Sequence, residues 1–220
     1  MATFHLKTPL ANEALKQLHV GDEVFLSGTI YMARDAAHKR FVDLLTAGKP
    51  LPVDLTGQVV FYAGPGPTKP GDVIGVVAPT SAYRMDPYAT VLFDHGVKGA
   101  IGKGNRGAAI RASCAANTAV CFSAIGGISA TLFACIKSAK VVAYEDLKTE
   151  AVQELEIEDF PLLVERLLRP RFLCGTGRQV PGTAPAAGLS DRRLESVERI
   201  PHVIAGKAGL THAQGSAVTC

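Results

Sequence analysis

The sequence predicts an α/β layered domain with a mixed sheet, and three observations lead to that class. Segments typical of strands and helices alternate along most of the chain, and the first third is rich in strands. Hydrophobic residues make up 47% of the 220 residues and charged residues 20%, which is ordinary for a soluble domain with a substantial core. The cationic motifs fall where strands end, and open α/β sheets bind their ligands at that edge.

The first elements follow from hydrophobic spacing and turn residues. Residues 12–18 have helical periodicity, and residues 24–31 form an apolar run after a Gly-Asp turn, which predicts a strand. Residues 35–47 place Ala, Phe and Leu on one helical face. Two prolines at 50 and 52 end this predicted helix, because a residue before proline is pushed out of the helical region.

The later elements alternate more regularly. Short apolar runs predict strands at 59–63, 73–78, 98–102, 119–124 and 140–144. A loop dense in glycine and proline, 64–71, separates the first two of these strands. Helical spacing predicts helices at 86–95, 107–119, 128–137 and 149–155.

The chain changes character after about residue 164. Residues 165–220 carry eight Lys/Arg and four Asp/Glu, and small residues and proline dominate their second half without periodicity. Such a composition cannot bury enough apolar surface to order itself. The sequence therefore predicts one domain over 1–164 and a disordered or loosely attached tail over 165–220.

Composition and charge exclude several classes of function. The net charge of +3 is too small to argue for nucleic-acid binding, and no apolar run reaches the ~18 residues of a membrane span. The first residues lack the layout of a signal peptide, so we expect a cytoplasmic protein. The five cysteines, at 114, 121, 135, 174 and 220, form no C-x-x-C pair, and the chain is expected to own no metal site. Cys114, Cys121 and Cys135 stand among small apolar residues and are expected to be buried hydrophobes.

Three separated motifs carry permanent cations beside a turn or a helix start. They contain Arg34, then Arg84 with Thr80 and Ser81 just before it, and then Lys103. A guanidinium meets a carboxylate with two parallel hydrogen bonds. Three cations with hydroxyl groups among them predict a clamp for a small molecule that bears more than one carboxylate.

The same motifs have other interpretations. Residues 102–107 match G-x-G-x-x-G, but a dinucleotide fingerprint needs an acidic residue about 20 positions later, and the next one is Glu145. A helix N-terminus with Lys103 beside it favours anions, so a stand-alone anion- or nucleotide-binding module is the alternative of another class. Thr80 is also compatible with a plain helix cap, and His38 with a core histidine.

These motifs resemble the C-terminal domain, or β subunit, of class I iron–sulfur fumarases and L-tartrate dehydratases. The matching stretches occur in the family order over about residues 3–164, and they are 27–30, 34–40, 62–65, 79–86, 102–105, 144–147 and 156–161. The Gly-Pro-Thr-Thr common in the family is Ala78-Pro79-Thr80-Ser81 here, so the second hydroxyl survives as serine. The segment after residue 164 departs from the family pattern.

The resemblance implies a swivelling β/β/α domain that holds the substrate against a partner α subunit carrying a 4Fe–4S cluster. It implies that Arg34 and Arg84 bind substrate carboxylates, that Lys103 helps to hold the substrate, and that Thr80 is the catalytic base. Supporting roles are assigned to Asp35, His38, Ser81, Gly104 and Asn105.

We therefore predict the β subunit of a two-subunit fumarate hydratase, with the L(+)-tartrate dehydratase β subunit as the close alternative. The stretch 156–161 favours fumarase. We expect a hetero-oligomer with the α subunit, or a homodimer through the β domain, and no activity from this chain alone. None of its five cysteines is expected to be a cluster ligand.

Overall fold

The computed structural model describes residues 1–124 and 129–166. Within them, seven strands form one sheet in the order β1-β2-β3-β6-β7-β9-β8, and β4 pairs with β5 in a small second sheet. The strands are β1 (Thr3–Lys7), β2 (Glu23–Met32), β3 (Val59–Phe61), β4 (Ala63–Pro65), β5 (Val77–Pro79), β6 (Gly99–Gly102), β7 (Val120–Ser123), β8 (Ile136–Ala143) and β9 (Val152–Arg166). The predicted α/β class with a mixed sheet is confirmed.

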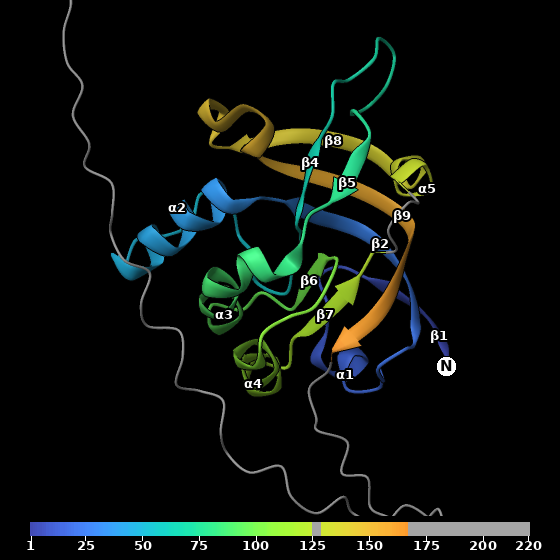
Figure 1. Ribbon diagram of the computed structural model, residues 1–220, viewed down its shortest axis with the longest axis vertical. Helices are drawn as coiled ribbons and strands as arrows, with labels where there is room; N and C mark the ends of the chain where they lie inside the picture. Colours follow the sequence, from blue (N-terminus) through green and yellow to red (C-terminus); the bar gives the residue numbers. More distant parts are fainter. Residues whose placement is uncertain (125–128, 167–220) are drawn as a thin grey trace, which may run out of the picture. The chain divides into compact units, whose positions relative to one another are not determined.

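The helices lie between these strands in sequence. They are α1 (Asn12–Leu15), α2 (Asp35–Thr46), α3 (Asp86–Asp94), α4 (Ala108–Asn117) and α5 (Ser129–Ala134), with 3₁₀ helices η1 (Ala82–Met85) and η2 (Glu145–Glu150). Figure 1 shows α2, α3 and α4 gathered on one side of the strands, while the β4–β5 hairpin projects away from them.

The large sheet closes on itself. β2, β3, β6 and β7 run parallel to one another in that order. β9 is antiparallel to both β7 and β2, so it joins the two ends of this parallel set. The carboxyl ends of the four parallel strands therefore lie at the same end of the closed sheet, where α/β folds bind ligands.

Side chains alternate between two cores along β3, β6 and β7. In β3, Val59 and Phe61 enter one buried cluster, whereas Val60 and the following Tyr62 enter the other. The first cluster is formed by the inward faces of the strands, including β9. The second cluster lies under α2, α3 and α4, where Phe41 is one of its fully buried side chains. Period-two alternation with both faces buried explains why these strands read as continuous apolar runs.

Two predicted elements are wrong and one was missed. The helix expected over 149–155 is the end of η2 followed by β9, whose residues pair with both β2 and β8. The strand expected over 73–78 is reduced to Val77–Pro79. β1, at residues to which the sequence analysis assigns no element, pairs in parallel with β2.

The predicted tail lies outside the described residues, apart from residues 165 and 166, which continue β9. The division into a domain over 1–164 and a tail stays a prediction. None of the helices in the described ranges has the length and apolar character needed to cross a bilayer.

Candidate functional site

Three of the predicted motifs lie at the carboxyl ends of neighbouring parallel strands. Arg34 follows β2 and precedes α2, and Lys103 follows β6. Thr80 follows β5, which returns antiparallel from the hairpin that β4 opens just after β3. The motifs are far apart in sequence, and the parallel order of the strands brings them to one edge of the sheet.

Backbone hydrogen bonds align the Thr80 segment with the Lys103 loop, which we define as residues 102–107. The Thr80 N–H donates to the Tyr62 carbonyl at 2.7 Å, and the Lys103 N–H donates to the Thr80 carbonyl at 3.2 Å. The Ala82 N–H in turn donates to the Lys103 carbonyl at 2.8 Å, and Ser81 forms a parallel bridge with Lys103. Thr80, Ser81 and Lys103 are therefore held side by side through their main chains.

Arg84 is joined to the start of α2 through Asp35. Its Nη2 lies 2.9 Å from Asp35 Oδ2, and the Arg84 side chain is 43% exposed. Asp35 also sits in the first turn of α2, where a carboxylate is favoured by the helix dipole. This contact brings the second and the first cationic motifs together, and it leaves part of the guanidinium open to a ligand.

Arg34 lies against Gly64 and the η2 carboxylate of Glu150. Its Nη2 is 3.6 Å from Glu150 Oε1, while Glu150 Oε2 accepts the Ala36 N–H at 3.0 Å. The glutamate therefore caps the N-terminus of α2 in place of a local side chain. Arg34 Nε is buried and has no hydrogen-bond partner within the described residues, so the guanidinium keeps donor capacity for a ligand.

His38 is completely buried below this cluster. Its Nδ1 lies 2.8 Å from the Arg34 carbonyl, and because a carbonyl only accepts, Nδ1 carries the proton. The ring packs against Tyr62 and Phe41, and burial lowers the pKa of His38 to about 4. His38 is therefore neutral near pH 7 and fixes the Arg34 main chain.

The Lys103 loop is exposed at its tip. Lys103, Gly104 and Asn105 are exposed, and Gly104 has φ +78°, a left-handed conformation that favours glycine. At the end of the loop, the Gly107 N–H donates to Asp86 Oδ2 at 2.6 Å. One N–H at the start of α4 is thus already occupied by a carboxylate, which argues against the anion site expected there for a nucleotide-binding module.

Two of the described cysteines lie close together in the core. Cys114 and Cys121 are buried with their sulfur atoms 3.7 Å apart, and the Arg106 guanidinium contacts Cys121 Sγ at 3.6 Å. No group of three or more His, Cys, Asp or Glu side chains suited to a metal occurs in residues 1–124 and 129–166.

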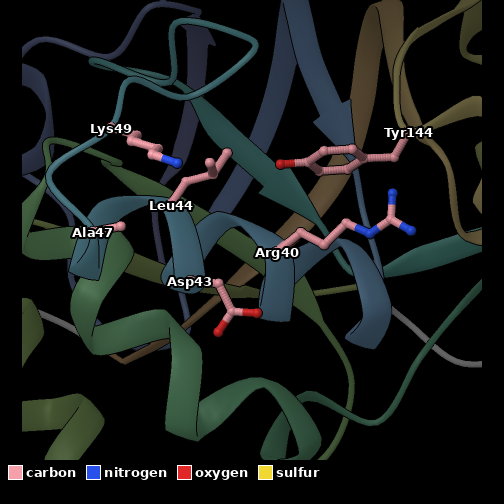
Figure 2. Close-up of a pocket in the computed structure, with 6 residues that line it drawn as sticks. All are labelled: Arg40, Asp43, Leu44, Ala47, Lys49 and Tyr144. Atoms are coloured by element: carbon pink, nitrogen blue, oxygen red, sulfur yellow. The ribbon is translucent and has the colours of Figure 1, made fainter.

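A separate hollow lies beside α2 and begins at Arg40, more than one helical turn after Arg34. Figure 2 shows its walls, and its volume is about 330 Å³. Arg40 crosses its rim, where it makes a bidentate ion pair with Asp146 and stacks on Tyr144. None of the residues predicted for the site lines this hollow.

Fold and site together define an α/β domain whose loops gather cations at one end of a closed mixed sheet. The sequence model of the family described as Fumarase C-terminus matches residues 1–166, and the chain belongs to that family. This membership confirms the resemblance found in the sequence.

The named relatives of the chain include fumarate hydratases and a tartrate dehydratase subunit. The chain is 36% identical over 163 residues to fumarate hydratase 2 of Leishmania major, covering 72% of this chain and 29% of the relative. It is 38% identical over 152 residues to the anaerobic class I fumarate hydratase of Escherichia coli (strain K12), covering 68% and 28%. It is 37% identical over 112 residues to the L(+)-tartrate dehydratase subunit beta of the same organism, covering 50% and 54%.

The chain thus spans less than a third of the length of these two fumarate hydratases and about half of the tartrate dehydratase subunit. The relatives are hydro-lyases by name.

The sequence reasoning missed three residues that organise the site. Glu150 is the second residue of the helix predicted over 149–155, and Arg106 occupies a variable position of the G-x-G-x-x-G match. The sequence analysis gives no role to either of them or to Asp86. Spacing alone does not reveal them, because each acts on a residue far away in sequence. Asp86 lay inside a matching stretch, and that was the one signal available.

Proposed function

We propose that this chain is the β subunit of a two-subunit iron–sulfur fumarate hydratase, which reversibly hydrates fumarate to malate. The observation that carries the proposal is the connected edge formed by Asp35–Arg84, Thr80, Ser81 and Lys103 at the ends of β2, β5 and β6. Membership of the fumarase C-terminal family supports the same class of reaction.

In this proposal Arg34 and Arg84 bind the two carboxylates of the C4 acid. Each guanidinium is oriented by a contact with a protein carboxylate, Glu150 for Arg34 and Asp35 for Arg84. Loss of a proton from carbon places developing charge on the neighbouring carboxylate. Preorganised cations stabilise that charge most where water is excluded. Lys103 adds a third positive group, and its flexible stem suits a point contact better than a planar one.

We assign the base to Thr80, which removes the proton from the carbon next to the one bearing the hydroxyl. A threonine hydroxyl is a weak base at its ordinary pKa, and nearby cations favour its ionised form. Its backbone position between Tyr62 and Lys103 fixes the direction of approach. Ser81, Gly104 and Asn105 are proposed to shape the same edge, while Asp35 and His38 orient Arg84 and Arg34.

The departing hydroxyl needs a Lewis acid, and the family resemblance implies that a 4Fe–4S cluster on the α subunit supplies it. This chain binds and orients the acid and moves the proton. It is therefore expected to be inactive by itself.

The decisive experiment is the conversion of malate to fumarate, followed anaerobically by ultraviolet absorbance. This chain is co-expressed with a candidate cluster-bearing α subunit, and each chain is also assayed separately. We expect turnover only with both chains present. Dehydration of malate at an enzyme-like rate by the purified chain alone would contradict the proposal.

L(+)-tartrate dehydration is the second candidate, favoured by the similarity to the tartrate dehydratase subunit beta. Both acids are C4 dicarboxylates with hydroxyl groups, so the same cations suit either. Tartrate is assayed in parallel with malate. A preference for tartrate in kcat/KM would select this candidate over fumarate hydration.

Replacing Gly64 by alanine tests the placement of Arg34. A Cβ at this position would lie 2.9 Å from Arg34 Cδ and 3.2 Å from the Thr149 carbonyl oxygen, so the arginine must move. We expect KM for malate to rise about tenfold, the equivalent of about 1.4 kcal/mol. The control is Gly66→Ala in the same hairpin, whose Cβ meets only the Val76 carbonyl at 3.4 Å. Equal effects of the two changes would contradict this role of Gly64.

A further inference from the structure

Arg106 is buried although it belongs to an exposed loop. Its side chain is 1% exposed, whereas Lys103, Gly104 and Asn105 of the same loop are exposed. The Arg106 Nε donates to Asp86 Oδ1 at 2.5 Å. The other oxygen of this carboxylate accepts the Gly107 N–H at 2.6 Å, so Asp86 holds both a side chain and the main chain at the end of the loop.

This carboxylate joins two cationic motifs. Asp86 comes two residues after Arg84, and Arg106 comes three residues after Lys103. The near end of the Lys103 loop is fixed by the main-chain bonds to Thr80 and Ala82. Because Asp86 fixes the far end, the segment that carries Lys103 is held on both sides.

The guanidinium is also held from its other faces. It lies over the Tyr62 ring, 5.3 Å from the centroid, which is a cation–π geometry, and its Nη1 contacts Cys121 Sγ. The carbonyl of Tyr62 accepts the Thr80 N–H. Arg106 therefore touches Tyr62, which holds Thr80, and Asp86, which lies two residues after Arg84.

Stability alone is a weak reason for such an arrangement. A buried ion pair loses hydration when it forms, and apolar residues of similar volume often stabilise a fold equally well. In some proteins such a pair instead fixes the geometry of the parts that it joins. α3 and α4 are also joined at their carboxyl ends, where Asn117 Nδ2 donates to Asp94 Oδ1 at 2.6 Å. The Asp86–Arg106 pair joins the first residue of α3 to the Lys103 loop just before α4, beside the cationic motifs.

We propose that Asp86 and Arg106 are positioning residues that hold Lys103 in register with Thr80 and Arg84. The proposal rests on the proposed function, because it assigns Lys103 to the binding of the dicarboxylate. Neither Asp86 nor Arg106 contacts the acid. They act through the loop.

The first measurement needs no substrate. Amide hydrogen exchange is recorded on the full chain for wild type, Asp86→Asn and Asp94→Asn. We expect exchange of the Lys103 amide to accelerate about tenfold in Asp86→Asn and to stay within twofold of wild type in Asp94→Asn. Unchanged exchange at Lys103 in a folded Asp86→Asn chain would overturn the positioning role, whatever reaction the enzyme catalyses.

The second measurement is a double-mutant cycle in the complex with the α subunit. We expect Asp86→Asn to lower kcat/KM for malate about tenfold, mainly through KM, while Asp94→Asn changes it less than twofold. In a Lys103→Ala background the effect of Asp86→Asn should fall below twofold, because the coupled residue is gone. An equal loss in both backgrounds, or equal losses for the two aspartates, would overturn the proposal.

Arg106→Lys provides a second test of the pair in case Asp86→Asn does not fold. It keeps the charge beside Asp86 and removes the planar fork. We expect the same selective rise in KM and the same coupling to Lys103. If wild type turns over neither malate nor tartrate, the proposed function fails, and the exchange measurement alone decides the positioning role.

Discussion

Replacing Arg84 by alanine is expected to lower kcat/KM for malate by about a hundredfold or more in the assembled enzyme. The change removes a fork of hydrogen-bond donors from the place where carboxylate charge develops, and losses of that kind typically reach 10²–10³-fold. The measurement is steady-state kinetics under anaerobic conditions, with the melting temperature recorded for each variant. Arg84→Lys keeps the charge without the fork and is expected to recover only part of the loss.

Arg40→Ala is the matched control for this prediction. The Arg40 side chain is 39% exposed and pairs with Asp146, much as Arg84 is 43% exposed and pairs with Asp35. Pairs with this exposure contribute ~0–1 kcal/mol to stability, so both alanine variants should fold. Arg40→Ala should stay within about threefold of wild type. A loss below tenfold for Arg84→Ala would contradict the role assigned to Arg84.

Acid is expected to destabilise the folded chain through His38. Burial lowers the pKa of His38 to about 4, whereas an exposed histidine titrates near 6.5. Between these values the unfolded chain holds a proton that the folded chain does not, so the free energy of unfolding falls as the pH falls. The difference corresponds to about 3 kcal/mol lost between pH 6.5 and pH 4, at about 1.4 kcal/mol per pKa unit.

The groups around His38 shift its pKa in opposite directions. The hydrogen bond to the Arg34 carbonyl and the charge of Asp35 favour the protonated ring, while Arg106 disfavours it, and burial outweighs them all. The rings of Phe41, Tyr62 and Tyr88 also pack against His38.

The test is denaturant unfolding at several pH values between 7 and 4 for wild type, His38→Gln and His95→Gln. His95 makes the same contact four residues back, Nδ1 to the Val91 carbonyl at 2.8 Å, but it is exposed. We expect His38→Gln to flatten the pH dependence by about 3 kcal/mol and His95→Gln to leave it unchanged. Identical slopes for wild type and His38→Gln would show that acid acts elsewhere.

The sequence predicts the parallel strands and the positions of the motifs because both depend on local pattern. The run 59–63 has both faces buried, and the motifs stand directly at strand ends. The segment 149–155 was assigned to a helix because its composition favours one. In the fold, Leu155 and Ile157 alternate with glutamates along β9, and pairing with β2 and β8 outweighs that local preference.

The supporting contacts of the site could not be predicted in the same way. Glu150 reaches Arg34 and Ala36 only because η2 follows β8 to the start of α2, and Asp86 reaches Arg106 only because α3 and α4 pack together. Such pairs depend on the packed arrangement of elements. A single sequence holds no local signal for them.

The closing strand also sets how the chain must fold. β2 pairs with β9 through residues 121 to 140 positions later, from Met32 with Gln153 to Glu23 with Leu163. Non-local pairing of this kind slows folding, because the loop must close before the contact is made. Until β9 arrives, β2 and β7 have unpaired edges that invite association with other chains. Nascent chains that have not yet added β9 should therefore depend on protection from aggregation.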